Sequence, residues 1–577
     1  MKKAALFFLF PLCLIANPTW QPEYSSGYEP KTIVYGKNMM VVSAHPFASE
    51  VGFKILQQGG NALDAAIAMQ MVLNVVEPQS SGIGGGAFLL YYRKKENQIY
   101  AYDGRETAPK GVNELLFCDS KGEAIPFVDA ILGGKAVGVP GVLKMLEMAH
   151  REHGKLPWRV LFQPAIEYAS QGFPISSRLH QLITKRPDLS TFPETKSYFF
   201  LENGKAKPEG TLLKNIPLAE TFKIIAVQGS DPFYKGEIAQ DIVSTVQKYS
   251  INPGVLALED LAAYRPIKRK VIQTTYRNYK IYSFPPPSAG GITLFQILGM
   301  LQQYNLKDEK PESIPFIHLF SQASALAFAD RNYYVADPDF FPVPTSRLID
   351  PTYLQQRGER IDRDQALEVS HGKWPSESET CCPPLLSSQS DENPSTSHIS
   401  VVDREGNAVS MTSSIENAFG STLMVRGFLL NNQLTDFSFI PEIQGKKAAN
   451  RVQPGKRPLS SMTPVLAFHK DSNQLFLTIG SGGGAWIIHY VAQALMGIID
   501  FDLTIQEAID FPHFVTIDKD MILEEKTLLH AKRKFLEEMG YQIKETPLNS
   551  ATHGIQLAPS CLMGGADPRR EGIAIGR

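Results

Sequence analysis

The sequence predicts a large globular protein in which helices and strands are mixed along one chain. Its 577 residues are 43% hydrophobic and 20% charged, a balance that can bury an extensive core and excludes general disorder. Residues 20–110 alternate strand-like and helical patterns, and residues 140–350 are richer in helical patterns. Residues 399–412 contain two β-rich runs around a turn of Asp, Gly and Asn, which is typical of a hairpin.

Local signals place the first elements of the chain. Residues 39–44 form a strand-like run, and residues 48–58 have helical spacing that stops at Gly59-Gly60, where glycine can adopt the left-handed cap. Asn61 then offers an N-cap to a second helix, whose body at residues 65–76 carries small side chains that pack closely.

The first seventeen residues have the layout of a secretory signal peptide. Lys2 and Lys3 precede an apolar run at residues 4–15, and the small residue Ala16 follows. This run is shorter than the roughly 20 apolar residues that span a bilayer, so a membrane anchor is the weaker interpretation. We expect a signal peptide at residues 1–16, no later membrane span, and a periplasmic or secreted mature protein.

Charge and cysteine content exclude several classes of protein. The 57 Lys and Arg residues balance 59 Asp and Glu residues, so no basic field favours nucleic acid as a partner. After signal removal four cysteines remain, too few for a disulfide scaffold and without the spacing of a zinc site. They are Cys118, Cys381, Cys382 and Cys561. One disulfide among them is possible, and the sequence does not assign it. We predict no metal and no cofactor.

A polar segment interrupts the globular pattern at residues 374–395, where six Ser and four Pro occur in 22 residues. This composition predicts a flexible linker that forms no packed element. Thr396 begins the strand-like run that follows. If the bond before Thr396 is cut, its α-amino group, with a pKa of about 7.7–8.0, can serve as the base that its hydroxyl needs as a nucleophile. On this pattern alone, a Ser- and Thr-rich loop without chemistry is the simpler interpretation.

Glycine-rich turns are the other local feature with chemical potential. No phosphate loop, zinc-protease helix or serine-hydrolase elbow occurs, and the glycines at residues 82–86 are better explained by close backbone packing than by phosphate binding. Residues 480–484 follow a strand-like run at 475–479, and their backbone N–H groups could stabilise an oxyanion. Residues 285–291 mark a rigid turn before another helix.

A series of motifs resembles the γ-glutamyltranspeptidase family of the N-terminal nucleophile hydrolases. These motifs run nearly from end to end and in one order: GGNALDAA at 59–66, SSGIGGGAF at 80–88, DGRETAP at 103–109, VGVPG at 137–141, FPPPSAGGIT at 284–293, AFADRNYY at 327–334, TSHISVVDREGNAVSMTSS at 396–414, LLNNQLTDFS at 429–438, GKRPLSSMTP at 455–464, GSGGG at 480–484 and GGADPRREG at 564–572.

The resemblance implies an α+β fold, a four-layer αββα sandwich made by one self-cleaving precursor. The cut would fall between Ser395 and Thr396. It would give a large subunit at residues 17–395 that ends in the linker, and a small subunit of 182 residues at 396–577. Because the two chains of this heterodimer would share one core, they are not separate domains.

The resemblance also assigns the reacting groups. Thr396 would be the nucleophile in self-cleavage and in catalysis. Ser414 stands where the family usually has a threonine that hydrogen-bonds the nucleophile, and a serine hydroxyl can make the same bond without the methyl that fixes the rotamer. Gly483 and Gly484 match the oxyanion pair.

Substrate recognition would use the two charged ends of a glutamyl group. Arg105 matches the residue that pairs with the α-carboxylate, since a guanidinium fork suits a planar carboxylate. The same resemblance gives Ser460 and Ser461 further hydrogen bonds to that carboxylate, and gives the α-ammonium to Gln433, Asp436 and Glu416. Many relatives carry Asn at the position of Glu416, so the extra negative charge here affects affinity and pH dependence. For Arg105 or Asp436 taken alone, an ordinary salt bridge is the simpler role.

These matches imply an exported γ-glutamyl hydrolase or transferase. Thr396 would attack a donor such as glutathione to form an acyl-enzyme, which water, an amino acid or a dipeptide would resolve. Only 23 residues, 437–459, separate Asp436 from Ser460, and this apparently shorter lid would admit larger substrates. A cephalosporin or glutaryl acylase or a poly-γ-glutamate depolymerase is the alternative of the same class, and an uncleaved binding protein without catalysis is the alternative of another class.

Overall fold

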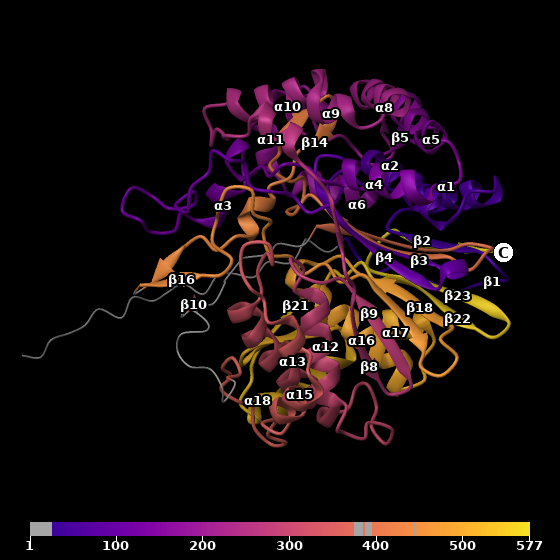
Figure 1. Cartoon of the computed structure of the whole chain (residues 1–577), viewed down its shortest axis with the longest axis vertical. Helices are drawn as coiled ribbons and strands as arrows, with labels where there is room; N and C mark the ends of the chain where they lie inside the picture. Colours follow the sequence, from indigo (N-terminus) through magenta and orange to yellow (C-terminus); the bar gives the residue numbers. More distant parts are fainter. Residues whose placement is uncertain (1–25, 374–384, 387–394, 444) are drawn as a thin grey trace, which may run out of the picture.

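The computed structural model describes residues 26–373, 385–386, 395–443 and 445–577. These residues form four layers, in which two central sheets are each covered by helices on the outer side (Figure 1). The α+β sandwich expected from the sequence is therefore confirmed.

Each central sheet has seven strands, and every neighbouring pair of strands is antiparallel. The order of the first sheet is β24 (Ile573–Gly576), β2 (Met40–Ser43), β11 (Thr396–Val402), β12 (Ala408–Ser414), β3 (Gly86–Arg93), β4 (Gln98–Asp103) and β7 (Ile267–Arg269). The order of the second sheet is β1 (Val34–Gly36), β23 (Cys561–Ala566), β22 (His553–Ala558), β18 (Leu475–Gly480), β17 (Val465–His469), β9 (Tyr279–Ser283) and β8 (Ile272–Tyr276). Both sheets combine strands from before and after Thr396, so the two segments share one core.

Helices cover the outer face of each sheet (Figure 1). Over the first sheet lie α1 (Pro46–Gln57), α2 (Ala62–Val76), α4 (Val142–His153), α5 (Trp158–Gln171), α8 (Ile216–Gln228) and α10 (Glu237–Lys248). Over the second lie α12 (Gly290–Leu301), α13 (Ile314–Tyr334), α15 (Pro351–Gly358), α16 (Ile487–Asp500) and α17 (Ile505–Asp510).

Shorter elements complete the described chain. The helices among them are α3 (Phe127–Ala130), α6 (Ser177–Thr184), α7 (Pro193–Phe199), α9 (Asp231–Lys235), α11 (Leu258–Ala263), α14 (Thr345–Leu348) and α18 (Arg533–Glu538). The strands among them are β5 (Phe173–Pro174), β6 (Leu212–Leu213), β10 (Leu385–Leu386), β13 (Met424–Val425), β14 (Phe428–Leu429), β15 (Glu442–Ile443), β16 (Lys446–Ala448), β19 (Phe514–Ile517), β20 (Asp520–Glu524) and β21 (Gln542–Thr546).

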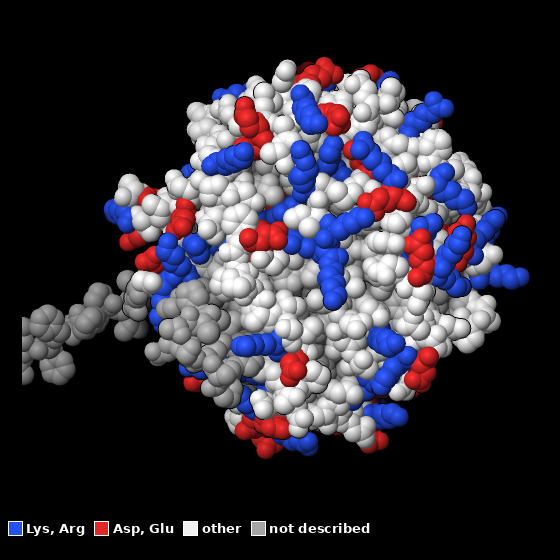
Figure 2. Space-filling model, viewed as in Figure 1, with Lys and Arg blue, Asp and Glu red and all other residues white. Residues whose placement is uncertain are grey.

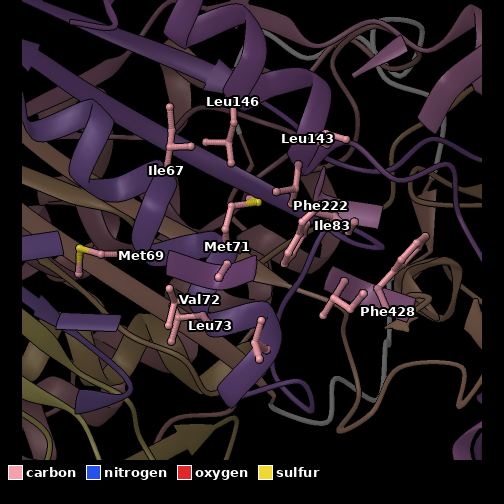
Figure 3. Packing of buried hydrophobic residues seen from close by; sticks show 14 of the residues in the cluster. Ile67, Met69, Met71, Val72, Leu73, Ile83, Leu143, Leu146, Phe222 and Phe428 are labelled. Atoms are coloured by element: carbon pink, nitrogen blue, oxygen red, sulfur yellow. The ribbon is translucent and has the colours of Figure 1, made fainter. Parts of the chain in front are cut away.

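The central strands are buried on both faces because each sheet lies between two layers. In β2, Val41 packs in the core under the helices of the first layer, whereas Met40 and Val42 pack in the core that continues to the second sheet. Figure 3 shows the first of these cores, where side chains of α2 meet Leu143 and Leu146 of α4 and Phe222 of α8. The strand period of two thus divides one run of apolar residues between two cores.

The local predictions for the first elements are confirmed with small shifts at their ends. Strand β2 and helix α1 occupy the expected runs, and Gly59 has a φ of 92° just beyond α1. Asn61 caps α2, which begins at Ala62 as this predicted N-cap requires. The two residues form a capping box, because Asp64 accepts from the N–H of Asn61 while Asn61 accepts from the N–H of Asp64. The expected hairpin is β11 and β12.

Two sequence predictions fall wholly or mainly outside the described residues. The signal peptide at 1–16 is one, and most of the linker at 374–395 is the other. Within that linker Leu385–Leu386 form β10, which pairs with β16, so the expectation that the segment contains no packed element does not hold there. A strand is recognised in a sequence by its alternation of apolar and polar residues, and two residues are too few to show it. The backbone hydrogen bonds that form such a strand do not depend on that alternation.

The cysteines, the surface and the helices complete the comparison with the sequence. Cys118 and Cys561 are free thiols, and Cys381 and Cys382 lie outside the described residues. Figure 2 shows Lys, Arg, Asp and Glu interspersed on the face in view. Among the helices described, none has both the length and the apolar character that crossing a bilayer requires.

Candidate active site

The pairing of β11 with β12 places Thr396 directly opposite Ser414. The Thr396 hydroxyl donates to Ser414 Oγ at 3.2 Å, and the Ser414 hydroxyl donates to the main-chain oxygen of Ser395 at 3.0 Å. Ser414 Oγ also accepts from the N–H of Glu416 at 2.8 Å, which fixes its position. A chain of hydrogen bonds therefore leads from the Thr396 hydroxyl to the carbonyl of the peptide bond that precedes Thr396.

That peptide bond is buried and held from its other side as well. Ser395 is fully buried, and its hydroxyl donates to the main-chain oxygen of Gln79 at 2.8 Å. Gln79 and its neighbour Ser80 belong to the segment between α2 and β3. Residues more than 300 positions away in the sequence thus fix the bond on which self-cleavage was predicted to act.

The predicted oxyanion loop lies against Thr396. It connects β18 to the turn Gly484–Trp486 (η5), which leads into α16. A Cβ on Gly482 would lie 2.2 Å from the main-chain oxygen of Thr396, so only glycine permits this approach. Gly483 and Gly484 have φ values of 133° and 57°, and in the described part of the chain neither N–H donates a hydrogen bond. Two N–H groups that donate no hydrogen bond within the described residues therefore follow Gly482, which touches Thr396, and lie near the positive end of α16.

A cavity opens over Thr396 and encloses about 280 Å³, including its part open to solvent. All the predicted catalytic and binding residues except Gly483 line it, together with two apolar side chains: Arg105, Thr396, Ser414, Glu416, Gln433, Asp436, Ser460, Ser461, Gly484, Met462 and Ile487. Among the described residues of 437–459, the predicted lid, none lines this cavity.

Arg105 and Asp436 form a buried ion pair in the cavity wall. Arg105 follows β4, and its Nη2 lies 2.5 Å from Asp436 Oδ2 while their side chains are 1% and 6% exposed. The same Nη2 donates to the main-chain oxygen of Leu459 at 2.6 Å, and Nε donates to that of Pro458 at 3.2 Å. The sequence suggested a free fork for a carboxylate. In the uncut chain these protein contacts occupy Nη2 and Nε, whereas Nη1 makes no hydrogen bond within the described residues and lies 3.7 Å from Glu106 Oε2.

The acidic side of the cavity is built by two segments. Gln433 and Asp436 lie in the short helix η4 (Gln433–Asp436), and Gln433 Nε2 donates to Asp436 Oδ2 at 3.0 Å. Gln433 Oε1 is buried and accepts no hydrogen bond from the described residues, so it can accept from an ammonium group. Glu416 follows β12 with a φ of 76° and is 4% exposed. Asp436 and Glu416 thus bring two carboxyl groups to one cavity.

The turn at residues 285–291 positions the two serines. Ser460 donates its N–H to the main-chain oxygen of Pro287, and the N–H of Ala289 donates to the oxygen of Ser460. Ser288 Oγ donates to the oxygen of Met462 at 2.7 Å. The proline-rich turn recognised in the sequence therefore serves as the backbone frame for Ser460 and Ser461.

Glu106 contacts Arg105 without lining the cavity, and the sequence reasoning missed it. Its side chain is fully buried, 3.7 Å from Arg105 Nη1, and neither carboxyl oxygen has a hydrogen-bond partner among the described residues. Burial raises the pKa of Glu106 to about 8, although the nearby Arg105 opposes the shift. An acid next to Arg105 in the DGRETAP motif is the signal that could have indicated it.

No metal-binding cluster is present among the described residues, where no three His, Cys, Asp or Glu side chains gather as a metal site would require. The residues that line the cavity offer hydroxyl groups, the backbone of Gly484 and charged side chains of both signs. This combination suits acyl transfer from a zwitterionic substrate.

Comparison with known proteins identifies a matching family. The model of the gamma-glutamyltranspeptidase family matches residues 48–577. A glutathione hydrolase proenzyme of Bacillus subtilis (strain 168) is 38% identical over 556 residues, which cover 95% of this chain and 93% of the relative. An acylase proenzyme, ACY 1 of Pseudomonas sp. (strain SE83), is 33% identical and covers 89% of this chain and 88% of its own.

A solved structure extends the similarity to three dimensions. The crystal structure of a cephalosporin acylase from Bacillus halodurans superposes with a TM-score of 0.83 at 27% identity, covering 96% of this chain and 99% of the acylase. The proteins that this chain resembles thus include a glutathione hydrolase proenzyme and two acylases.

Proposed function

Because the chain belongs to the γ-glutamyltranspeptidase family, an enzyme family of γ-glutamyltransferases and glutathione hydrolases, we propose that it is a self-cleaving enzyme with Thr396 as its nucleophile. The observation that carries the proposal is the chain of hydrogen bonds from Thr396 through Ser414 to the carbonyl of Ser395. It aligns a hydroxyl, a relay and a carbonyl at the base of one cavity.

Self-cleavage begins when Thr396 Oγ attacks the carbonyl carbon of Ser395. The hydroxyl proton passes to Ser414 Oγ, and the proton of Ser414 passes to the carbonyl oxygen as the tetrahedral centre forms. When that centre collapses, the carbon–nitrogen bond breaks, the proton moves to the nitrogen of Thr396, and an ester remains on Oγ. Water then hydrolyses the ester and frees both the hydroxyl and the α-amino group of Thr396. The large subunit would comprise residues 17–395 and the small subunit residues 396–577.

Catalysis repeats this attack on a γ-glutamyl donor. The free α-amino group of Thr396, with a reference pKa of about 7.7–8.0, takes the hydroxyl proton, and the N–H groups of Gly483 and Gly484 stabilise the oxyanion. The donor amine leaves with a proton, and an acyl-enzyme forms. Water, an amino acid or a dipeptide then attacks the ester and releases glutamate or a new γ-glutamyl compound.

The charged walls of the cavity select the donor. Arg105, Ser460 and Ser461 would hold the α-carboxylate, while Gln433, Asp436 and Glu416 would hold the α-ammonium. Glutathione and other compounds with a terminal γ-glutamyl group have both charges. The Bacillus subtilis relative carries the name glutathione hydrolase proenzyme, which supports both the donor class and the processing.

A second function of the same class has support from the names of two relatives. The Pseudomonas acylase and the Bacillus halodurans cephalosporin acylase share the fold. A glutaryl side chain has no α-ammonium, so two carboxyl groups in the cavity would not assist an acylase. The acidic wall therefore favours the γ-glutamyl donor over the acylase and over a poly-γ-glutamate depolymerase that acts away from a free terminus.

The proposal is tested on purified protein by γ-glutamyl-p-nitroanilide turnover with and without glycylglycine. We expect release of p-nitroaniline, faster with the acceptor if transfer competes with hydrolysis. N-terminal sequencing should find a small chain that starts at Thr396, whereas one full-length band on a denaturing gel would favour an uncleaved binding protein. Export follows from the signal peptide proposed at 1–16, and sequencing of the large chain should find its start at residue 17.

A further inference from the structure

A second buried arginine contacts a residue of the candidate active site. Two guanidinium groups contact residues 458–461: Arg105 donates to the oxygens of Pro458 and Leu459, and Arg331 Nη2 donates to Ser461 Oγ at 2.7 Å. Arg331 lies near the end of α13, is 3% exposed, and does not line the cavity itself.

The contact with Arg331 decides how the Ser461 hydroxyl can be used. A guanidinium group has donors and no acceptor, so Ser461 Oγ is the acceptor in this contact and the Ser461 hydrogen is not donated to Arg331. Ser460 is constrained in the same way, because its Oγ accepts from the N–H of Met462 at 3.2 Å. Both oxygens accept from the protein, and both residues line the cavity. A carboxylate can accept from such a pair of hydroxyl groups.

We propose that Arg331 is a positioning residue for the α-carboxylate of the donor substrate. It acts through Ser461, which it fixes as a hydrogen-bond donor and polarises with a full positive charge. It also brings a second buried cation to residues 458–461, which Arg105 contacts at Pro458 and Leu459. The inference rests on the proposed function, since it concerns the same γ-glutamyl donor.

The neighbouring Arg357 shows what a purely structural arginine looks like in this region. Arg357, on α15, donates to Asp330 Oδ1 and to the main-chain oxygens of Leu326 and Ser370, all at 2.9–3.0 Å. It is as buried as Arg331 and packs α15 against α13. Arg331 Nη1 donates to Asn332 Oδ1 at 2.8 Å, but its Nη2 donates to the hydroxyl oxygen of Ser461, a residue that lines the cavity. Arg357 is therefore the matched control.

The test compares two donors in Arg331→Met, Arg331→Lys and Arg357→Lys. One donor is γ-glutamyl-p-nitroanilide, and the other is 4-aminobutyryl-p-nitroanilide, which keeps the amine and lacks the α-carboxylate. For Arg331→Met we expect kcat/KM to fall about ten- to hundredfold with the γ-glutamyl donor, mainly through KM, and less than about threefold with the other. Arg331→Lys should retain part of the activity, because an ammonium group can still donate to Ser461. Arg357→Lys should leave the ratio of the two donors unchanged.

A double-variant cycle separates positioning from packing. If Arg331 acts through Ser461, Arg331→Met should cost little more in a Ser461→Ala background. The fraction of each variant that appears as two chains on a denaturing gel reports its folding. If Arg331→Met does not mature, kcat/KM for the two donors is compared in Arg331→Lys instead.

The outcomes distinguish the inference from the function on which it rests. Equal losses with both donors, or additive effects in the double variant, would overturn the inference alone. A wild-type protein that matures and leaves γ-glutamyl-p-nitroanilide intact would overturn the proposed function, and the role of Arg331 with it.

Discussion

Replacing Ser414 by alanine should slow self-cleavage about 10²- to 10³-fold. The substitution removes the donor that lies 3.0 Å from the Ser395 oxygen, the atom on which negative charge develops. Loss of one such donor typically costs about 2.7–4 kcal/mol of transition-state stabilisation. It also removes the acceptor 3.2 Å from the Thr396 hydroxyl, so the relay loses both of its connections.

The assay follows conversion of a freshly synthesised precursor into two chains on a denaturing gel over time. Ser414→Thr should convert at close to the wild-type rate, because it keeps the hydroxyl. Ser413→Ala is the matched control, since Ser413 is equally buried in the same strand and its hydroxyl donates to Gly86 on the neighbouring strand. Thermal unfolding of each precursor reports the cost of leaving the N–H of Glu416 without its acceptor, about 1–3 kcal/mol.

Two results would refute this reasoning. Ser414→Ala that matures at the wild-type rate would show that the Ser395 carbonyl needs no donor from this residue. Ser413→Ala that is as slow as Ser414→Ala would show that the effect comes from disturbed strand pairing and not from the relay.

Three further predictions concern the charged groups of the cavity. Arg105→Lys should lower kcat/KM for γ-glutamyl donors about ten- to hundredfold while maturation continues. The planar guanidinium group can contact Asp436 and a ligand at the same time, whereas the single ammonium group of lysine cannot. Asp436→Asn should raise the ratio of kcat/KM for a glutaryl over a γ-glutamyl anilide, and adding Glu416→Gln should raise it further, because only the γ-glutamyl group has an ammonium to pair. Glu106→Gln should abolish a rise in KM above about pH 8, since the wild-type carboxyl then ionises 3.7 Å from Arg105.

Each of these predictions has a result that would contradict it. Unchanged kinetics in Arg105→Lys would show that another residue binds the substrate carboxylate. An unchanged ratio of the two donors in the Asp436→Asn, Glu416→Gln double variant would show that other residues bind the ammonium group. For Glu106, the wild-type free energy of unfolding should also fall between about pH 4.5 and pH 8, because the unfolded chain releases this proton first. A pH profile of KM that is identical in wild type and Glu106→Gln would remove Glu106 from substrate binding.

Much of the architecture was predictable from the sequence because its signals are local. The spacing of apolar residues located β2 and α1, and Asn61 identified the start of α2 through its own hydrogen bonds. The change from a polar segment to a β-rich run placed Thr396 at the first residue of β11. Each of these features depends on residues within a few positions of one another.

The chemistry of the candidate site depends on contacts between distant residues, so only the tertiary structure decided it. Motif matches named Arg105 and Asp436 as separate contacts for a substrate, whereas the folded chain joins these residues, 331 positions apart, in one ion pair. Glu106 has a raised pKa only because the fold buries it, and Arg331 contacts Ser461, 130 positions further along the chain, only in the folded protein. A side chain's partners and the pKa values of its groups are set by what surrounds it in space, and at these positions the surroundings come from segments that sequence periodicity does not connect.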